Sequence, residues 1–339
     1  MQTYISKPEI GFPKSEIRNN TEMMNILGLQ DSRKLKILFK KGGVNTKFST
    51  YNFKENKSNE DMTKMCFESI EKLFINNKIT AKDIDCIITC YNSTDQQLPG
   101  LSSRLFSEID FNKNIHNYPI FGLGCGAFVS AIKLSNTLLK DENIKNILVV
   151  CCEAQTHMYF ENSDPNDNGQ LMSVTIFGDG ASATLITKDS SFNCNKLQVI
   201  DTKVSTCYSN SMSMKNNIVH LDEKLLENIS PHIYDLVSSL LEEHGLKKED
   251  IDHWVMHSGG KKILAGVKKL FDLSDDQMLP SLQVYKNYGN ISCASVPVGL
   301  NRLYTLSEDN KYMKNPGDLG IILGFGSGFF LGASLVKYL

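Results

Sequence analysis

The chain has 339 residues, of which 41% are hydrophobic and 22% charged, and a net charge of −2 at pH 7. These values are typical of a globular protein with one large domain or two ordinary ones, and they give no electrostatic case for nucleic acid or an anionic membrane as partner. The nine cysteines include no CxxC pair and no Cys/His cluster at metal spacing. This argues against a disulfide framework and a bound metal. Because the N-terminus has no signal-peptide core and no apolar run is long enough to span a membrane, we expect a cytoplasmic protein.

The hydrophobic pattern predicts strands that alternate with helices. Residues 1–55 look irregular, apart from a helix near 20–27 and a basic stretch, 33–41, which we interpret as a solvated helix face rather than a phosphate site. Further helices are predicted over residues 59–77, 98–109 and 226–244. Strands are predicted within the stretches 79–90 and 146–152, both as buried strands, within 118–121, and within 174–187 as two strands around a glycine turn.

The second half of the chain repeats the order of the first. LKKEDIDHWVMH (246–257) matches ITAKDIDCIITC (79–90), and each segment follows a predicted helix. YGNISCASVPVGLNRLY (288–304) takes the place of a glycine-rich segment around Cys125, and a Phe-Gly-Ser-Gly stretch near the C-terminus mirrors an earlier Phe-Gly-Asp-Gly. Three matched segments in one order predict a duplicated α/β unit, with halves at 1–188 and 189–339.

The segment GLGCGAFVSAIKLSNTLL (122–139), after a short apolar run, predicts a strand, a tight glycine turn and a helix, with Cys125 at the helix N-terminus. Unpaired amides and the helix dipole favour an anion there, so we expect a lowered pKa for this thiol. The flanking glycines, Gly122, Gly124 and Gly126, leave room for a substrate or a second backbone. For a cysteine considered alone, a buried structural role would be the commoner interpretation.

The duplication supplies partners for this cysteine. Equivalent turns of the two halves should meet around a pseudo-twofold axis, beyond the carboxyl ends of the strands, so Cys125 should face Asn290, with His257 close by. These are the residue types of a nucleophile, a base and an orienting or oxyanion-binding group. Taken singly, His257 could be a satisfied core histidine and Asn290 a left-handed turn residue. Their joint placement favours the catalytic interpretation.

At these residues the sequence resembles the thiolase superfamily, specifically its 3-oxoacyl-[acyl-carrier-protein] synthase III group, and also the type III polyketide synthases. GLGCGAF resembles the nucleophile turn, and IFGDGASATLI the strand–turn–strand that follows it. MHSGG (256–260) is closer to the polyketide synthase version of the histidine segment, whereas YGNISCASVPVGL is closer to the synthase III version of the asparagine segment. GFGSGFF (324–330) fits the C-terminal glycine loop. The resemblance spans about residues 60–339 and is specific for the superfamily, not for a substrate.

The resemblance implies a thiolase-like five-layered αβαβα fold, a homodimer, and Cys125 as acyl acceptor. His257 and Asn290 would stabilise the enolate that forms when a malonyl extender loses carbon dioxide. The backbone amides of Cys125 and Ser327 would form the oxyanion hole. Leu98 and Phe325 would line the substrate tunnel, Leu98 as a gate that crosses the dimer. No tightly bound cofactor and no metal is implied, and the substrates would be thioesters of coenzyme A or of acyl carrier protein.

Two family features are missing. Synthase III enzymes usually have an N-terminal tryptophan that stacks on coenzyme A and an arginine near an Asp-Pro segment, but the only tryptophan here is Trp254, and Asn168 stands in the arginine's place. Either basic residues within 33–47 replace these contacts or a carrier protein delivers the acyl group. Leu98 stands where synthase III often has phenylalanine, which suggests a longer or wider acyl tunnel.

We therefore expect a decarboxylative Claisen condensing enzyme, β-ketoacyl synthase III-like, in fatty acid or specialised polyketide-type biosynthesis. The two missing residues favour the specialised role. One alternative is a same-fold acyltransferase that forms an ester or amide and would have no use for Asn290. Another is a non-catalytic partner subunit of a synthase complex, which would be expected to have lost Cys125 or His257.

Overall fold

A computed structural model describes residues 2–14, 16–17, 22, 24–25, 33–52, 57–58, 62–94, 96–156, 168–191, 196–215, 218–309, 312 and 314–339. Ten of the strands belong to one mixed sheet: β1 (Thr3–Ser6), β2 (Glu9–Gly11), β7 (Cys86–Tyr91), β8 (His116–Phe121), β9 (Asn146–Glu153), β10 (Gly180–Thr187), β11 (Lys196–Ser209), β14 (His253–Met256), β15 (Leu319–Gly326) and β16 (Gly328–Tyr338). Three two-stranded sheets complete the described strands: β3 (Glu16–Ile17) with β4 (Lys47–Phe48), β5 (Tyr51–Asn52) with β6 (Lys57–Ser58), and β12 (Met212–Lys215) with β13 (Ile218–Leu221).

The described α-helices are α2 (Arg33–Gly42), α3 (Met62–Asn77), α4 (Leu101–Leu105), α5 (Ala127–Leu138), α7 (Asn168–Ile176), α8 (Leu225–Glu243), α9 (Lys261–Phe271), α10 (Leu279–Tyr288) and α11 (Ser295–Glu308). Short 3₁₀ turns are η1 (Ala81–Asp83), η2 (Gly124–Gly126), η3 (Lys248–Asp250) and η4 (Ser292–Ala294). The turns η2 and η4 lead directly into α5 and α11. No helix in the described part of the chain is both long enough and apolar enough to span a membrane.

The main sheet has two parts with the same strand order. One part runs β1-β10-β9-β7-β8 and the other β11-β16-β15-β14, and β1 pairs with β11 to join them. In each part an antiparallel pair, β10–β9 or β16–β15, is followed by a parallel strand, β7 or β14. Strand β8 extends the first part and forms its outer edge. Strands β7 and β9 are nearly continuous apolar runs because helices cover both of their faces.

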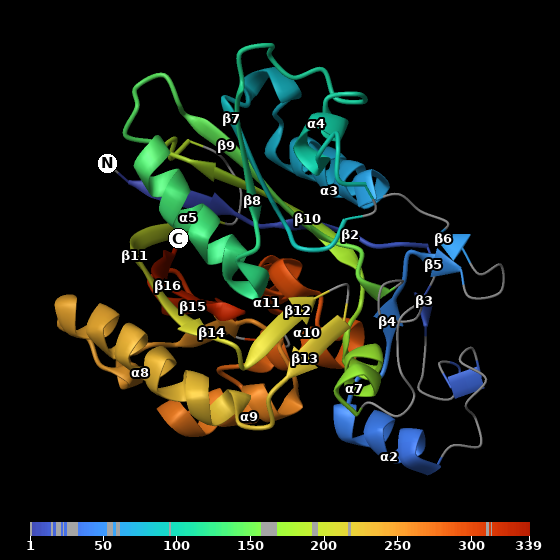
Figure 1. Cartoon of the computed structure of the whole chain (residues 1–339). Helices are drawn as coiled ribbons and strands as arrows, with labels where there is room; N and C mark the ends of the chain where they lie inside the picture. The colour runs from blue at the N-terminus through green and yellow to red at the C-terminus, as the bar shows by residue number, and fades with distance from the viewer. Residues whose placement is uncertain are drawn as a thin grey trace.

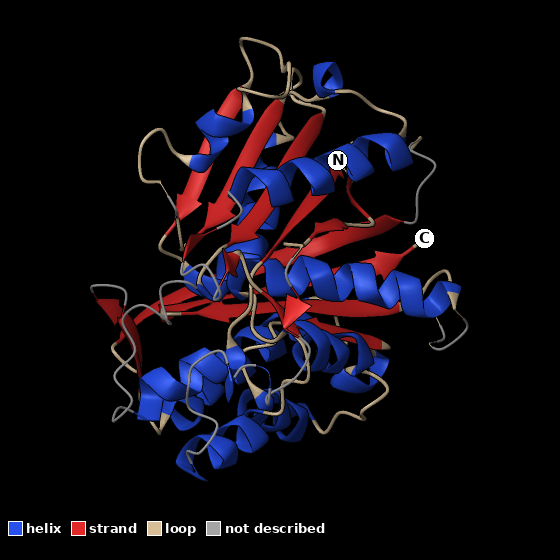
Figure 2. Cartoon of the chain, turned by 90° about the vertical axis from the view of Figure 1, so that its right-hand side faces the viewer, coloured by secondary structure: helices blue, strands red, loops and turns tan. Residues whose placement is uncertain are grey.

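The elements stack in five layers (Figures 1 and 2). Helices α3 and α4 cover the outer face of the first part of the sheet, and α8 and α9 lie beyond the second part. Between the two parts lie α5 and α11, and each of these helices packs against strands of both. The predicted five-layered αβαβα fold is therefore confirmed.

Three apolar clusters separate these layers. Ile70, Leu148 and Leu185 belong to the cluster under α3. The neighbouring strand residue Val149 belongs instead to the cluster around α5 and α11, because successive side chains of a strand point to opposite faces. A third cluster joins α8 and α9 to the second part of the sheet and includes the single tryptophan, Trp254. A strand covered in this way cannot shift, so its carboxyl end holds residues in fixed positions.

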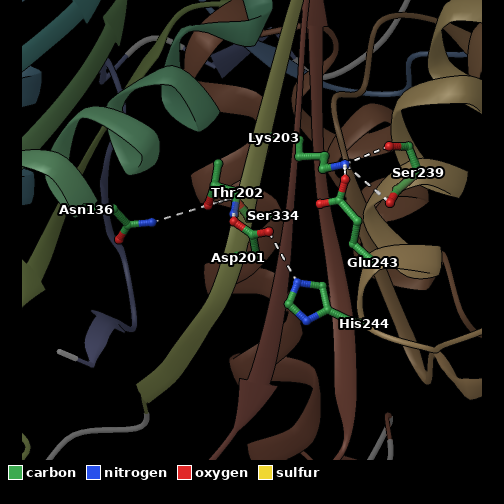
Figure 3. A network of polar contacts seen from close by, with 8 residues as sticks. All are labelled: Asn136, Asp201, Thr202, Lys203, Ser239, Glu243, His244 and Ser334. Carbon is green, nitrogen blue, oxygen red and sulfur yellow. Dashed lines mark hydrogen bonds and ion pairs between the residues drawn. The ribbon is translucent and has the colours of Figure 1, made fainter.

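Figure 3 shows how β11 connects the middle layer to the outer one. The buried Thr202 hydroxyl lies 2.9 Å from Ser334 Oγ on β16 and accepts a hydrogen bond from Asn136 of α5 at 3.5 Å. Lys203 points the other way and donates to Glu243 of α8 at 2.5 Å. Lys203 also contacts Ser239 of α8 at 2.6 Å, and Asp201 contacts His244, the residue that follows α8, at 3.2 Å.

Most of the predicted elements are present, with shifted ends. The helix predicted at 98–109 is only the five residues of α4, and the one predicted near 20–27 lies mostly outside the described residues. The first of the two strands predicted within 174–187 is wrong, because residues 174–176 form the last turn of α7. Packing of α7 against α2 overrides the β-propensity of these residues. The prediction of an irregular N-terminus missed β1, which lies in the middle of the sheet.

Candidate active site

Cys125 lies in the tight turn that precedes α5, as predicted. The turn is possible because Gly122 and Gly124 adopt positive φ angles of 84° and 59°. The Cys125 side chain is only 2% exposed. Burial raises the pKa of this thiol to about 12, although the hydrogen bond between the thiol and Ser292 acts in the opposite direction. The expected low pKa is therefore wrong, because enclosure of the sulfur by protein outweighs the effect of the nearby helix terminus.

Asn290 lies in the turn between α10 and η4. Its backbone is fixed beside the end of α7, since its N–H donates to Ile176 O at 2.7 Å and its carbonyl accepts from Gly178 N at 3.1 Å. The side-chain oxygen accepts a hydrogen bond from Ser292 N at 2.8 Å, and the side-chain nitrogen lies 3.4 Å from Gly259 O. These contacts orient the amide so that its N–H groups point toward the segment that follows His257.

His257 follows β14 directly, and its N–H donates to Leu323 O of β15 at 2.9 Å. The His257 imidazole and the Phe325 ring pack edge to face, with their centroids 5.3 Å apart. The imidazole is 3% exposed, and its Nδ1 has no hydrogen-bond partner among the described residues. Burial lowers the pKa of His257 to about 3. At neutral pH the ring is therefore uncharged and can donate one hydrogen bond.

The loop between β15 and β16 packs directly on the cysteine turn. A methyl group at Gly326 would lie 2.7 Å from the Cys125 nitrogen, and one at Gly124 would lie 3.0 Å from the Ser327 nitrogen. Two backbones can approach this closely only where side chains are absent. The two amides predicted to form an oxyanion hole, those of Cys125 and Ser327, are thus brought to one place.

Leu98 is the one predicted site residue that does not join this group. Its side chain is 85% exposed, whereas Cys125, His257, Asn290 and Phe325 are all buried. Leu98 lies in the loop before α4, so it cannot line the enclosed site of its own chain.

Three further residues surround the cysteine turn, and the sequence prediction missed them. Asn92 follows β7, and its side-chain amide makes two hydrogen bonds to Gly124. Its Oδ1 accepts from Gly124 N at 2.9 Å, and its Nδ2 donates to Gly124 O at 3.2 Å. Glu153 ends β9 and accepts hydrogen bonds from Asn92 Nδ2 at 2.8 Å and from Ser93 Oγ at 2.6 Å. Ser292 lies 3.5 Å from the cysteine sulfur. Polar residues at the carboxyl ends of two buried strands were the signal that could have revealed Asn92 and Glu153.

The described residues include no group of three or more His, Cys, Asp or Glu side chains that could hold a metal ion. The chemistry available here is that of a thiol, a neutral imidazole, an amide and two backbone N–H groups. These groups suit acyl transfer, in which a sulfur nucleophile and oxyanion donors are needed.

Comparison with known proteins identifies the class. Residues 44–224 match the family described as FAE1/type III polyketide synthase-like protein, and residues 241–338 match the C-terminal part of 3-oxoacyl-[acyl-carrier-protein] synthase III. Together with the layered fold, these matches define a thiolase-like condensing enzyme, an acyltransferase. Because the first match covers more than half of the chain, the chain belongs to the FAE1/type III polyketide synthase-like family.

Similar curated proteins are named β-ketoacyl-[acyl-carrier-protein] synthase III. The protein of Rickettsia massiliae (strain Mtu5) is 25% identical over 283 residues, which covers 81% of this chain and 83% of the relative. That of Rickettsia felis (strain ATCC VR-1525 / URRWXCal2) is 24% identical over 287 residues, with the same coverage. That of Rickettsia akari (strain Hartford) is 23% identical over 293 residues, covering 83% and 85%. The resemblance inferred from the motifs is confirmed.

Proposed function

We propose that this enzyme performs a decarboxylative Claisen condensation, in which an acyl group on Cys125 is joined to a malonyl thioester. The observation that supports these roles most directly is a chain of contacts through three loops. Cys125 Sγ lies 3.5 Å from Ser292 Oγ, Ser292 N donates to Asn290 Oδ1 at 2.8 Å, and Asn290 Nδ2 lies 3.4 Å from Gly259 O, two residues after His257. These contacts link the cysteine turn to Asn290 and to the segment that follows His257.

In the first half-reaction the Cys125 thiolate attacks the acyl carbonyl and forms a new C–S bond. The amides of Cys125 and Ser327 hold the oxyanion, and the carrier thiol leaves with a proton. In the second half-reaction the malonyl C–C bond breaks with loss of carbon dioxide. The His257 and Asn290 N–H groups hold the enolate oxygen, and the new carbanion attacks the acyl-cysteine and releases the thiolate. An oxyanion donor is typically worth about 3 kcal/mol.

The neutral state of His257 supports this assignment. An imidazolium would carry its full positive charge in the resting enzyme, before any negative charge has developed on the substrate. The depressed pKa of His257, about 3, instead leaves a neutral N–H that interacts strongly only when negative charge develops.

The roles are tested by Asn290→Ala. Loading of an acyl group onto Cys125, followed by intact-protein mass spectrometry, should be nearly unchanged, whereas condensation should fall by about two to three orders of magnitude. Asn287→Ala, three residues earlier on α10, is the matched control and should retain both activities. If Asn290→Ala condenses normally, the Claisen roles are wrong and the same-fold ester- or amide-forming acyltransferase becomes the better proposal.

We also propose that a carrier protein delivers at least one substrate. The support is a basic helix, α2, with exposed Arg33, Lys34, Lys36, Lys40 and Lys41. The end of α2 lies beside the start of α9, where a methyl group at Gly43 would be 3.3 Å from Lys261 Cδ. Since α9 begins shortly after His257, basic side chains flank one approach to the site. An acidic carrier would be attracted to such a surface.

The measurement is kcat/KM for the same acyl or malonyl unit on coenzyme A and on carrier protein. We expect a preference for the carrier that weakens at about 0.5 M salt, where the Debye length is roughly 4 Å. Lys40→Glu combined with Lys41→Glu should reduce use of the carrier form only. Lys64→Glu, on the outer helix α3, is the control. Equal use of both forms with no effect of salt would contradict this proposal.

The homodimer is proposed from the edge of the sheet. Strand β8 pairs with β7 on one side, and most of its residues are exposed, including Phe121 at 61%. An exposed strand edge is a template for a second strand, and β8 of a second copy would continue the sheet. Leu98, 85% exposed in the single chain, would then reach the tunnel of the partner.

Location and pathway also remain proposals. We propose a cytoplasmic enzyme of specialised polyketide-type biosynthesis, supported by the match of residues 44–224 to the FAE1/type III polyketide synthase-like family and by the absence of the N-terminal tryptophan. Mass spectrometry of the product made from a series of acyl starters would distinguish one condensation, as in the start of fatty acid synthesis, from several.

A further inference from the structure

The sulfur of Cys125 has one hydrogen-bond partner among the described side chains, the hydroxyl of Ser292, at 3.5 Å. Neither His257 nor Asn290 makes a hydrogen bond to it in the described structure. A buried thiolate needs a donor, because the charged form loses the hydration that it would have in water. Ser292 is the side chain that is placed to supply one.

The backbone at Ser292 favours a role for its side chain. Ser292 has a φ of 48°, a left-handed conformation that glycine or asparagine adopts more readily than serine. The residue is 5% exposed, and its N–H is held by Asn290 Oδ1 at 2.8 Å. Strained backbone of this kind persists where surrounding contacts impose it, often at functional sites. Here it directs the hydroxyl to the sulfur.

Asn92 connects this hydroxyl to the cysteine turn. Its side-chain oxygen accepts from Gly124 N at 2.9 Å. The side-chain nitrogen faces Glu153 Oε1 at 2.8 Å, Gly124 O at 3.2 Å and Ser292 Oγ at 3.5 Å. The neutral thiol of Cys125 also donates to this oxygen, so Ser292 Oγ accepts both bonds and its own hydrogen can turn toward the sulfur once the thiolate forms.

Glu153 fixes the orientation of the Asn92 amide. Its carboxylate is fully buried and accepts hydrogen bonds from Asn92 Nδ2, Ser93 N and Ser93 Oγ, the last two at 3.0 and 2.6 Å. A carboxylate accepts but does not donate, so the nitrogen of Asn92, and not its oxygen, must face it. The Asn92 amide nitrogen is therefore the donor both to Glu153 and to the Ser292 oxygen.

We propose that the Ser292 hydroxyl is a further catalytic group, which donates a hydrogen bond to the Cys125 sulfur and stabilises the thiolate before acylation and again on its release. We assign Asn92, held by Glu153, as the residue that positions both Ser292 and the Gly124 turn. The inference rests on the proposed role of Cys125 as the acyl acceptor. No atom is transferred through Ser292, which keeps its proton throughout.

Other ionisable groups around the sulfur do not replace this donor. Burial raises the pKa of Cys125, Ser292 lowers it, and the charge of Glu153 raises it. His257 is neutral, and Cys293 of η4 donates to Cys90 O at 3.2 Å instead. The remaining ionisable side chains on the helix and strand packed against η2 lie farther along those elements: Lys133 on α5, and Lys337 and Tyr338 on β16.

The experiment measures the rate of alkylation of Cys125 by iodoacetamide against pH, with peptide mass spectrometry to identify the modified residue. Ser292→Ala should move the midpoint of the pH profile upward by about one unit and slow alkylation about tenfold below the midpoint. Ser292→Thr keeps a hydroxyl and should restore much of the rate. Ser295→Ala is the matched control, since this fully buried hydroxyl, three residues later, has no hydrogen-bond partner among the described residues.

Asn92→Ala should shift the profile in the same direction, and the double variant Asn92→Ala/Ser292→Ala should shift it no further than Ser292→Ala alone. Additive shifts would overturn the positioning role of Asn92. An unchanged midpoint in Ser292→Ala, with an unchanged melting temperature, would overturn the role of Ser292.

The alkylation profile does not depend on condensation, so the two proposals can fail separately. If Ser292→Ala shifts the profile but the natural enzyme forms no carbon–carbon bond, the proposed function fails and this inference stands. If condensation proceeds from acylated Cys125 and Ser292→Ala leaves the profile unchanged, this inference fails alone.

Discussion

At the scale of single residues, burial sets the charge of the groups that would do the chemistry. It raises the pKa of Cys125 to about 12 and lowers that of His257 to about 3, so both are neutral in the resting protein. A neutral thiol and a neutral imidazole can share a small enclosed space without either charge being desolvated. Reactivity then depends on hydrogen bonds that stabilise the thiolate as it forms, which is the role assigned to Ser292.

His257 should make the folded protein sensitive to acid. The unfolded chain binds a proton on this imidazole near its ordinary pKa of 6.5, but the folded chain does so only near 3. The unfolded state therefore binds more protons within that interval, and the free energy of unfolding falls as the pH decreases from 6.5 toward 3. In urea unfolding at several pH values, the free energy of unfolding should decline less with decreasing pH for His257→Gln than for the natural protein. His232→Gln, at an exposed position, should leave the decline unchanged, and parallel curves for all three would contradict the argument.

Lys47 should make the free energy of unfolding depend on pH in the alkaline range. Its ammonium group is buried, which lowers its pKa from 10.5 to about 7 despite the attraction of Asp179. The unfolded chain holds this proton up to about 10.5, so stability should rise as the pH increases from 7. Lys47→Met should reduce that rise in chemical unfolding experiments, with Lys64→Met as an exposed control. A variant with the same pH dependence as the natural protein would show that Lys47 stays charged.

At the scale of elements, the site is made by loops that leave the carboxyl ends of strands from both parts of the sheet. The cysteine turn follows β8, Asn92 follows β7, Glu153 ends β9, and His257 follows β14. Corresponding elements occur in the same order in the two parts, which supports our proposal that the chain is duplicated, with halves at 1–188 and 189–339. The loop of Gly326 and Ser327 closes the arrangement.

Gly326→Ala should disrupt the cysteine turn. The added methyl group would lie 2.7 Å from both Cys125 N and Leu123 O, and these backbone atoms cannot move away without displacing the turn. Since misplacement of reacting groups by about 1 Å can cost about a hundredfold, we expect a loss of that order in the rate of Cys125 acylation. Gly100→Ala, where the nearest atom is the Tyr91 hydroxyl at 3.2 Å, should acylate normally. Acylation of Gly326→Ala at the natural rate would contradict the assignment of Cys125 and Ser327 to one oxyanion hole.

At the scale of the whole molecule, the exposed edge of β8 is the place where a second copy would extend the sheet. The apolar side chain of Phe121 on this edge is 61% exposed, and burial of such a side chain contributes roughly 2–3 kcal/mol. A dimer formed here would also bring Leu98 to the partner's tunnel. Assembly and activity would then depend on each other.

Phe121→Asp should therefore give a monomer in light-scattering measurements and lose condensation activity together with the dimer. The control is Ile75→Asp, which introduces the same charge at a position 68% exposed on α3. If the Phe121→Asp protein remains a dimer, or if the natural protein is a monomer with full activity, assembly through β8 is wrong.

The sequence by itself determined the class of protein and the three residues proposed for catalysis. Glycine spacing around Cys125, the repeated Asp-Ile-Asp turns and the buried apolar strands are local patterns, and local patterns are visible in a sequence. They were sufficient to predict a duplicated α/β unit, the turn before α5 and the meeting of the Cys125 and Asn290 turns, and the family resemblance that they carry implied the five layers.

The tertiary structure alone decided the rest. That β1 lies in the middle of the sheet, and that residues 174–176 end a helix instead of forming a strand, follows from pairing with distant segments. The raised pKa of Cys125 and the network of Asn92, Glu153 and Ser292 depend on burial and on contacts between residues far apart in the chain. Burial and distant hydrogen bonds are properties of the packed molecule, because their energies depend on which groups exclude water around an atom.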